Sequence, residues 1–410
     1  MTPTVDDAQR LIAARVALTQ QIDRGSAVLS SRLAGAFLNV PRHPFVPVFY
    51  RRHGDRFVPW RRTDGDAEAW LDAVYSDDSL ITEVAGIHAE DATSEGLSGV
   101  PTSSSTAPSL MADMLDALDV REGDEVYEAG TGTGYNAAIL SFLAGDRHVT
   151  TVDRTGALTA KARPRLGSVG FDPLVLHGDA ARDFPGDTTY DRIIATASVR
   201  RVPPAWLARL RPGGIMVVPL KGALAGGMVA RLTKLPDGTA AGHILHTPAA
   251  FMPLKSAPDR PVPPPPSPDG PCADAGVSAR VLDDWTFSFF AELHLPPGLV
   301  RTYGTNDEGL HVTTLHDPAD GSVTRVDDRP EGPPRVTRRG PRDLWEPVER
   351  AHRLWERLNR PRREWFAIEA TPAEQNVRYT APDGHVHRWR LSPPKAVRAT
   401  GPRPRTASPD

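Results

Sequence analysis

The sequence predicts a doubly wound α/β domain followed by a smaller α+β domain. From residue 108 onward, short β-rich runs alternate with helical ones, which is typical of parallel strands joined by helical crossovers. A glycine-rich turn at 130–134 lies between such a strand and a helix. Four consecutive prolines at 263–266 interrupt the pattern, and 410 residues exceed the usual size of one hydrophobic core. Two folded units joined by a linker are therefore expected.

The N-terminal region is expected to be helical at first and irregular afterwards. Apolar residues recur at helical spacing between Ala8 and Leu38 and stop at the turn Pro41–Pro44, which predicts one or two helices. The pattern weakens between Arg51 and Ser105, and the polar, acidic stretch Glu83–Gly99 is expected to be a loop that acts as a lid. Residues 1–101 are thus assigned to N-terminal helices and a substrate-side loop.

The central domain, residues 102–256, is expected to carry a seven-stranded sheet. A helix is expected from Pro108, and further helices near Tyr135, Gly156 and Pro203. Five parallel strands are expected at Glu125–Ala129, His148–Asp153, Pro173–His177, Arg192–Ala195 and Ile215–Pro219. An antiparallel hairpin with strands at Met228–Leu235 and His243–Leu254 is expected to close the sheet.

A proline-rich linker at 257–275 separates this domain from an α+β domain at 276–395, and residues 396–410 are expected to be a disordered tail. The second domain is expected to contain four elements: a strand at Trp285–Leu293, a hairpin within Leu310–Val326, an amphipathic helix at Leu344–Leu358 and a last strand pair within Phe366–Trp389.

Composition limits the environment and the partners. The single cysteine, Cys272, allows no internal disulfide and no zinc site, which fits a reducing cytoplasm. Charged residues interrupt the first 20 positions, and the chain contains no long apolar run, so neither a signal peptide nor a membrane span is expected. Arginine is dense at 335–405, which indicates an acidic partner or simply a GC-rich coding sequence. Nucleic acid is not expected.

The strongest chemical signal is the segment Glu128–Gly134, which follows a predicted strand and opens a helix. Its three glycines let the backbone approach a ligand, and the helix N-terminus offers unpaired N–H groups. Asp153 ends the next strand, where a carboxylate can accept both hydroxyls of a ribose, and Asp179 follows the third strand. Carboxylates at the ends of adjacent strands suit a nucleoside.

Five short motifs follow one another along the central domain, each occurring once. They are Glu-Ala-Gly-Thr-Gly-Thr-Gly-Tyr at 128–135, Gly-Asp-Ala at 178–180, Asp-Arg-Ile-Ile-Ala-Thr at 191–196, Leu-Arg-Pro-Gly-Gly at 210–214 and Phe-Met-Pro-Leu at 251–254. With these motifs, the segment 102–254 resembles the protein-L-isoaspartate O-methyltransferase family. Two upstream segments, 40–47 and 75–78, also look like motifs of that family.

The resemblance implies a Rossmann-like methyltransferase domain that uses S-adenosyl-L-methionine. Glu128 is then expected to orient the glycine turn and the methionine end of the cofactor, Asp153 to hold the ribose, and Asp179 with Ala180 to hold the adenine edge. The implied cofactor-binding residues are Glu128, Gly130, Thr131, Gly132, Gly134, Tyr135, Asp153, Arg154, Gly178, Asp179, Ala180 and Thr196.

On the substrate side, the family has a hydroxyl residue shortly before an Ala-Pro pair, and Ser103–Pro108 matches that pattern. By this resemblance Thr106, with Ser105 beside it, should contact the substrate carboxylate as the catalytic pair. The alternative is that a Ser/Thr run before a proline is ordinary helix-entry sequence. No general base is required, because a carboxylate already carries the attacking oxygen.

The chain departs from compact family members by an insertion at 82–101 and by the second domain. This long form, with Gly340–Trp345, looks like the methyltransferases encoded beside lanthipeptide synthetases or ATP-grasp macrocyclases. That likeness implies an enzyme that esterifies an Asp side chain of a modified ribosomal peptide (a lanthipeptide or graspetide), leading to aspartimide and isoaspartate. The accessory domain would then recognise the peptide. Isoaspartate repair and a non-catalytic peptide-binding chaperone remain as alternatives.

Other polar residues are weaker candidates. His385 and His387 could bind a metal from one strand face, but no third ligand is evident, so a polar strand is favoured. The same holds for His311 and His316. Asp77 and Asp78 could line the substrate cleft, yet acidic residues are common in turns, which makes them weak candidates. No metal is expected.

Overall fold

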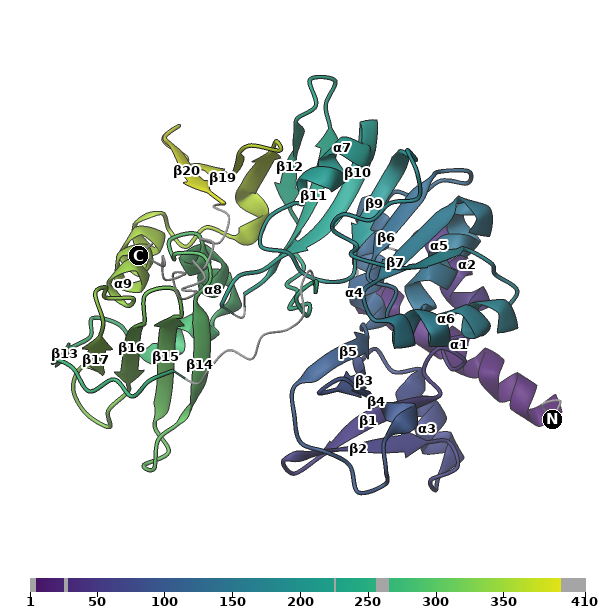
Figure 1. Ribbon diagram of the computed structural model, residues 1–410, viewed down its shortest axis with the longest axis horizontal. Coiled ribbons are helices and arrows are strands. Elements are labelled where there is room, and N and C mark those ends of the chain that lie inside the picture. Colours follow the sequence, from purple (N-terminus) through teal and green to yellow (C-terminus); the bar gives the residue numbers. More distant parts are fainter. Residues whose placement is uncertain (1–4, 26–28, 225, 256–264, 392–410) are drawn as a thin grey trace, which may run out of the picture. The chain divides into compact units, whose positions relative to one another are not determined.

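The computed structural model describes residues 5–25, 29–224, 226–255 and 265–391 (Figure 1). The chain forms two compact units. The described part of the first unit comprises the residues up to 221, the segment 226–255 and the C-terminal segment 360–391. The described part of the second unit comprises residues 222–224 and 265–359. The tail expected at 396–410 lies outside the described residues.

The main sheet of the first unit has ten strands in the order β20-β19-β18-β12-β11-β10-β9-β6-β7-β8. The strands are β6 Val126–Ala129, β7 Val149–Asp153, β8 Leu174–His177, β9 Tyr190–Ala195, β10 Leu210–Leu220, β11 Met228–Lys234, β12 Ala240–Ile244, β18 Phe366–Ala370, β19 Gln375–Thr380 and β20 Val386–Arg390. The five strands from β6 to β10 pair in parallel, as predicted. The predicted hairpin is present as β11 and β12, but its second strand is Ala240–Ile244 rather than His243–Leu254. It does not close the sheet, because β12 pairs with β18, so the sheet has ten strands instead of the seven expected.

Helices pack around these strands. They are α1 Val5–Gly25, α2 Ser31–Asn39, α4 Pro108–Leu118, α5 Tyr135–Ala144, α6 Gly156–Ser168 and α7 Pro204–Arg209, with short turns η2 Asp146–His148 and η4 Arg363–Trp365. The one or two helices predicted in the N-terminal region are present as α1 and α2. The α5 helix begins directly after the glycine turn, and nearly all of its side chains are buried. It therefore carries the turn rigidly into the core.

A second, smaller sheet precedes the main one in the chain. It contains β1 Val48–His53, β2 Arg56–Arg61, β3 Leu80–Val84, β4 Ile87–His88 and β5 Pro101–Ser105, with α3 Ala67–Val74 and the turn η1 Ala89–Asp91. The loop expected at 83–99 is thus partly wrong, because the structure forms β4 and η1 there. The strand signal was hidden in the sequence: β1 buries its first three residues and exposes its last three, so burial does not alternate.

The C-terminal strands belong to the first unit. The sequence analysis placed 276–395 in one domain, whereas β18 pairs antiparallel with β12 and extends the main sheet. Pairing over more than 100 residues of chain leaves no local sequence signal. Within β12, a Cβ at Gly242 would lie 1.8 Å from the carbonyl oxygen of Arg231 in β11, so the pairing of β12 with β11 requires a glycine at this position.

The second unit holds a five-stranded sheet in the order β13-β17-β16-β15-β14. Its elements are β13 Cys272–Asp274, η3 Ala279–Asp283, α8 Trp285–Glu292, β14 Val300–Thr305, β15 His311–Asp317, β16 Ser322–Asp327, β17 Arg335–Arg339 and α9 Glu346–Arg357. The predicted hairpin and amphipathic helix are confirmed as β15–β16 and α9. Within the described residues, none of the helices combines the length and apolar character needed to span a membrane.

One element of the second unit was predicted wrongly. Trp285–Leu293 was expected to be a strand because aromatic residues favour strands, but it forms α8. The Asp284 side chain caps this helix by accepting from the N–H groups of Thr286 (2.8 Å) and Phe287 (3.1 Å). Burial of the aromatic side chains on several sides of α8 outweighs their strand preference.

Candidate active site

The glycine turn joins β6 to α5 and adopts backbone angles that other residues avoid. Gly130 and Gly134 have φ values of 108° and 89°. A Cβ at Gly130 would lie 2.6 Å from the hydroxyl oxygen of Thr196, and one at Gly134 would lie 3.2 Å from the Cβ of Ala162 in α6. The turn is therefore packed between the end of β9 and α6, and only glycine fits these two positions.

Glu128, the third residue of β6, lies under the turn and is fully buried. One carboxyl oxygen accepts from Asn136 Nδ2 at 2.7 Å, and the other accepts from Thr151 Oγ1 at 2.7 Å. The Thr151 hydroxyl lies 2.8 Å from that of Thr131 in the turn. Burial raises the pKa of Glu128 to about 7, even though the two hydrogen bonds favour its ionised form.

Asp153 ends β7 and faces the turn. Its two carboxylate oxygens accept from the backbone N–H groups of Gly132 (3.0 Å) and Thr155 (2.9 Å). Each oxygen retains a lone pair for a further donor. Asp153 thereby ties the end of β7 to the middle of the glycine turn.

Asp179 lies just after β8 and approaches the end of β7. One of its carboxylate oxygens is 3.9 Å from Nη1 of Arg154, and the other accepts from the N–H of Ala181 at 3.0 Å. The N–H of Gly178 donates to the carbonyl of Asp153 at 3.0 Å. The carboxylates predicted at these two strand ends therefore lie at one edge of the sheet.

Ala180 and Thr196 hold the backbone around the site. The Ala180 carbonyl accepts from the hydroxyl of Tyr127 (3.0 Å) and from the indole N–H of Trp206 (2.8 Å). The Thr196 hydroxyl donates to the carbonyl of Gly130 at 2.6 Å. Their side-chain and carbonyl contacts fix the shape of the site.

The predicted hydroxyl segment lies beside the glycine turn. The segment is the end of β5 and the entry to α4, and the carbonyl oxygen of Ser104 lies 3.9 Å from where a Cβ of Gly132 would be. Ser105 is buried, with 4% of its surface exposed, whereas Thr106 is half-buried. Of the two predicted catalytic hydroxyls, Thr106 is the more accessible one.

Arg42 is a fully buried guanidinium that holds this segment in place. It donates to the backbone carbonyls of Ser105 (3.4 Å) and Thr106 (3.2 Å). It also donates to carbonyls in the segment 74–78, those of Val74 (3.1 Å), Ser76 (2.8 Å) and Asp78 (2.9 Å). Burial lowers the pKa of Arg42 to about 10, which still leaves it charged at neutral pH.

Asp77 and Tyr135 contact neighbouring parts of the protein and stabilise the fold around the site. The carboxylate of Asp77 accepts from the N–H of Ser109 at 2.8 Å and so caps α4, whose own N-cap residue is an alanine. The Tyr135 ring packs against Phe45, with ring centroids 5.7 Å apart, and 5% of the residue is exposed. The side chain of Tyr135 therefore points into the core behind the turn.

The histidine candidates do not form a metal site in the described part of the chain, where no cluster of three potential ligands occurs. His385 and His387 belong to an aromatic row, in which the His387 ring stacks on Trp389 with centroids 5.9 Å apart. His311 approaches Asp283 at 3.4 Å, and His316 is buried with 5% exposure. Aromatic packing accounts for His385 and His387, and the contact with Asp283 accounts for His311.

The sequence missed the residues that support the site from a distance. Arg42, Asn136 and Thr151 were given no role, although Arg42 and Asn136 stand inside or next to recognised motifs. A usable signal existed for Asn136, because it lies eight residues after Glu128, in the first turn of the helix that the motif opens. For Arg42 the motif at 40–47 marked the segment but not the role of the side chain, since its acceptors lie 32 to 64 residues away.

Comparisons with known proteins agree with this arrangement. The family model described as Protein-L-isoaspartate(D-aspartate) O-methyltransferase matches residues 91–258. A protein-L-isoaspartate O-methyltransferase of Ignicoccus hospitalis is 40% identical over 151 residues, which are 36% of this chain and 71% of that relative. One of Methanopyrus kandleri is 34% identical over 210 residues, 50% of this chain and 76% of the relative. The family match ends at residue 258, before the larger part of the second unit, which the structure describes from residue 265.

Two solved structures complete the comparison. One described as a protein-L-isoaspartate O-methyltransferase aligns with a TM-score of 0.49 and 19% identity, covering 91% of this chain and 98% of its own. Another, from Plasmodium falciparum and solved with S-adenosyl-L-homocysteine, aligns with a TM-score of 0.44 and 14% identity, covering 59% of this chain and 98% of its own.

Proposed function

The chain belongs to the protein-L-isoaspartate O-methyltransferase family, and we propose that it methylates an Asp-derived carboxylate within a peptide that its second unit selects. Its activity class is that of an S-adenosyl-L-methionine-dependent protein carboxyl O-methyltransferase. The observation that carries the proposal is the position of the hydroxyl segment, whose Ser104 carbonyl lies beside Gly132 of the glycine turn. A cofactor site and a carboxylate site at that edge would adjoin.

The residues at the sheet edge fit the cofactor. A Cβ at Gly132 would meet only the carbonyl oxygen of Ser104, at 3.9 Å, so the middle of the turn leaves room for the close approach of a ligand. Asp153 keeps acceptor capacity at the end of β7, as a ribose requires. S-adenosyl-L-methionine supplies an electrophilic methyl group on a sulfonium. Glu128 provides a buried carboxyl group that balances positive charge when it is ionised.

The chain itself has little chemistry to perform. A substrate carboxylate oxygen forms a bond to the methyl carbon, the carbon–sulfur bond breaks, and no proton moves. Thr106 would donate a hydrogen bond that orients the carboxylate, while Arg42 holds the backbone of Thr106 in position. Once esterified, an Asp side chain can be attacked by the next backbone nitrogen, which expels methanol and gives a succinimide.

Two substrate classes are compatible with this site. The names of the relatives favour an isoaspartyl residue, as in repair. The second unit, which follows the family match, favours a dedicated peptide whose ordinary Asp is esterified during its maturation. We favour the dedicated peptide, a modified ribosomal peptide, because a general repair enzyme must accept many sequences and gains nothing from an added recognition unit.

Mass spectrometry on two peptides tests the substrate class. The enzyme and S-adenosyl-L-methionine are incubated with an isoaspartyl test peptide and, separately, with a precursor peptide encoded beside the gene, before and after its cyclisation. The proposal expects one added methyl group, or the loss of one water, on the precursor at lower enzyme concentration than on the test peptide. Methylation of the isoaspartyl peptide alone would establish repair instead.

A further inference from the structure

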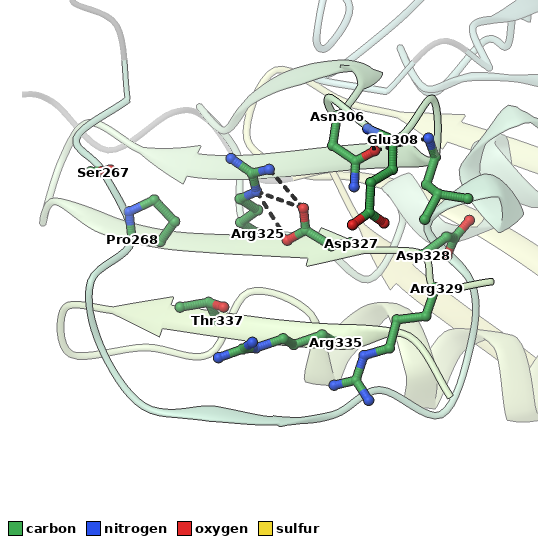
Figure 2. Close-up of a pocket in the computed structure, with 11 residues that line it drawn as sticks. Ser267, Pro268, Asn306, Glu308, Arg325, Asp327, Asp328, Arg329, Arg335 and Thr337 are labelled. Carbon is green, nitrogen blue, oxygen red and sulfur yellow. Dashed lines mark hydrogen bonds and ion pairs between the residues drawn. The ribbon is translucent and has the colours of Figure 1, made fainter. Parts of the chain in front are cut away.

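Figure 2 shows a pocket of about 400 Å³ on one face of the sheet in the second unit. Its floor is formed by side chains of β16 and β17, and its rims are the segment Ser267–Pro268 and the loop Asn306–Leu310. The opposite face of the same strands carries Val326 and Val336, which are fully buried. The sheet therefore turns an apolar face to the core and a polar face to the pocket.

Two arginines lie diagonally on this polar face. In the register of β16 and β17, Arg325 stands opposite Thr337, and Asp327 stands opposite Arg335. All four side chains thus point to the same side, as Figure 2 shows, and Arg329 adds a third guanidinium at the end of β16. None of these residues serves the site described above.

The guanidinium groups have more donors than their neighbours use. Arg325 donates from Nε and Nη2 to Asp327, at 2.7–3.0 Å, and its Nη1 has no partner among the described residues. Arg335 donates from Nε (3.3 Å) and Nη2 (3.0 Å) to the sulfur of Cys272, and its Nη1 is likewise without a described partner. Two N–H-bearing groups therefore remain available in the pocket.

The carboxylates around the pocket are mostly committed. Asp327 accepts from Arg325 with both oxygens, and Asp328 accepts from the hydroxyl of Ser278 (2.7 Å) and the N–H of Ala279 (3.0 Å). Glu308 is the exception: its carboxylate points into the pocket and has no partner among the described residues. The pocket thus combines surplus cationic donors with one free carboxylate.

We propose that this pocket binds an acidic segment of the peptide substrate, with an Asp or Glu carboxylate on Arg325 and Arg335 and a peptide N–H on Glu308. Guanidinium groups bind carboxylates through strong, directional hydrogen bonds, and an extended peptide presents its N–H groups beside its side chains. This inference rests on the proposed function in one respect, namely that the ligand is a peptide. According to this inference, the second unit binds peptide segments selectively when they contain Asp or Glu.

The reactivity of the Cys272 thiol can be used to measure whether this pocket is occupied. Cys272 is its single cysteine, is exposed, and contacts the pocket residues Arg335 and Thr337. Hydrogen bonds from Thr337 and Arg335 lower the pKa of the thiol, which favours the reactive thiolate. A carboxylate that engages Arg335 would compete with the sulfur, so binding should slow the reaction of Cys272 with a disulfide reagent.

The experiment uses the full chain without cofactor. A fluorescein-labelled peptide of alternating Gly and Asp is titrated and followed by fluorescence anisotropy, in parallel with its Gly-Asn counterpart. We expect the Asp peptide to bind about tenfold more tightly and to slow the reaction of Cys272. Arg325→Gln and Arg335→Gln should each weaken binding of the Asp peptide about tenfold. Glu308→Gln should strengthen it severalfold, because the amide oxygen still accepts the peptide N–H while the negative charge that repels an acidic peptide is removed.

Arg353→Gln is the matched control, because Arg353 lies on α9, is exposed, and pairs only loosely with Glu349 at 3.9 Å. It should leave binding unchanged. Equal affinity for the Asp and Asn peptides, or equal loss in all three arginine variants, would overturn the inference. Methyl transfer to the precursor peptide and to a short isoaspartyl peptide is measured in parallel: absence of transfer to both would refute the proposed function without touching the binding result.

Discussion

Glu128 is a carboxyl group whose burial has a measurable consequence for pH dependence. Its pKa in the folded protein is raised to about 7, so between about pH 4.5 and pH 7 the folded chain holds a proton that the unfolded chain has lost. This contribution to stability is present at low pH and is lost as the pH rises. Glu128→Gln cannot titrate at this position, so we expect it to remove a total stability change of up to about 3 kcal/mol across this pH range.

Thermal unfolding of both proteins at pH 5 and pH 7.5 measures this change. The control is Glu125→Gln, because Glu125 lies at the other end of the strand and is hydrogen-bonded to His148 at 2.8 Å. An identical change in the wild type and in Glu128→Gln would show that Glu128 is ionised throughout this range, contrary to the assignment.

The same group should couple cofactor binding to pH. Because S-adenosyl-L-methionine carries a sulfonium charge, an ionised Glu128 favours its binding more than a protonated one does. We expect its affinity to rise about tenfold between pH 6 and pH 8 in the wild type and to stay nearly flat in Glu128→Gln. Isothermal titration calorimetry measures both series, and a rise that persists in Glu128→Gln would assign the effect to another group.

Arg42 is the residue on which the substrate-side backbone depends most. Lys at this position keeps the charge but cannot reach the separate carbonyls of segments 74–78 and 105–106, so several buried acceptors lose their donors. We expect Arg42→Lys to lose about 3 kcal/mol of stability and to raise the KM for peptide more than the KM for cofactor.

The matched control is Arg32→Lys. Arg32 also donates to two backbone carbonyls, those of Val120 (3.1 Å) and Leu143 (2.8 Å), but far fewer groups depend on it. It should cost about 1 kcal/mol and leave both KM values unchanged. Chemical denaturation and steady-state kinetics, performed below the unfolding temperature, separate the two variants. A parallel rise of both KM values in Arg42→Lys would reduce Arg42 to a purely structural role.

At the residue scale, the sequence predicted what is local. The glycine turn and the acids after β7 and β8 form a pattern in which each residue stands at the end of its own strand, and the structure brings them to one edge. Arg42 could not be predicted in this way, because its role arises only when three separate segments meet around one side chain. The Tyr135 ring was equally hidden, since the motif fixes its backbone but not the direction of its side chain.

At the scale of elements, the inserted segment is clamped to the cofactor-side helix. The carboxylate of Glu90 in η1 binds Lys161 of α6 at 2.8 Å and also contacts Arg165, which donates to the carbonyl of Phe45 at 3.2 Å. Burial alone would raise the pKa of Glu90, but the hydrogen bond from Lys161 and the charge of Arg165 outweigh it, so the pKa is lowered. The insertion is thus fixed to α6, whereas the sequence suggested a free lid.

Removing this carboxylate charge should loosen the insertion. We expect Glu90→Gln to cost about 1 kcal/mol, since the ion pairs are only partly buried, and to lower Tm by about 2–4 °C. Asp91→Asn is the control, because Asp91 binds the same Lys161 at 3.2 Å but its side chain is 61% exposed. Differential scanning calorimetry at neutral pH compares them. An equal change in both variants would mean that no specific clamp exists.

The elements that the sequence predicted correctly are those with strong local periodicity, such as the parallel strands and α9. Those it missed have a physical reason in common. In β1 burial is split between its two halves, and in α8 an aromatic composition typical of strands is overridden by an Asp cap and by packing. Both cases depend on tertiary contacts that a local pattern does not contain.

For the whole molecule, the main consequence is that the chain leaves the first unit and returns to it. The side chain of Gln375 in β19 is fully buried and bonds the N–H (2.9 Å) and carbonyl (2.8 Å) of Val202. Together with the pairing of β18 and β12, this ties the last strands to the methyltransferase sheet. No linear division into two consecutive domains describes this chain.

Two shortened chains test this topology. A chain that ends at residue 259 lacks β18–β20 and exposes the edge of β12, so we expect it to aggregate. A chain in which residues 265–359 are replaced by a flexible Gly/Ser linker keeps these strands and should remain folded. Size-exclusion chromatography and circular dichroism distinguish them. A well-folded, monomeric chain ending at 259 would show that the returning strands are dispensable.

We propose that this chain transfers a methyl group to a carboxylate, and the chemistry of the product tests that transfer most directly. Enzyme is incubated with the peptide substrate and S-adenosyl-L-methionine labelled in its methyl group, and the product is treated with mild base. A carboxyl methyl ester releases the label as volatile methanol, which is the result we predict. Label that resists base, or cofactor binding without any transfer to peptides of either class, would contradict the account.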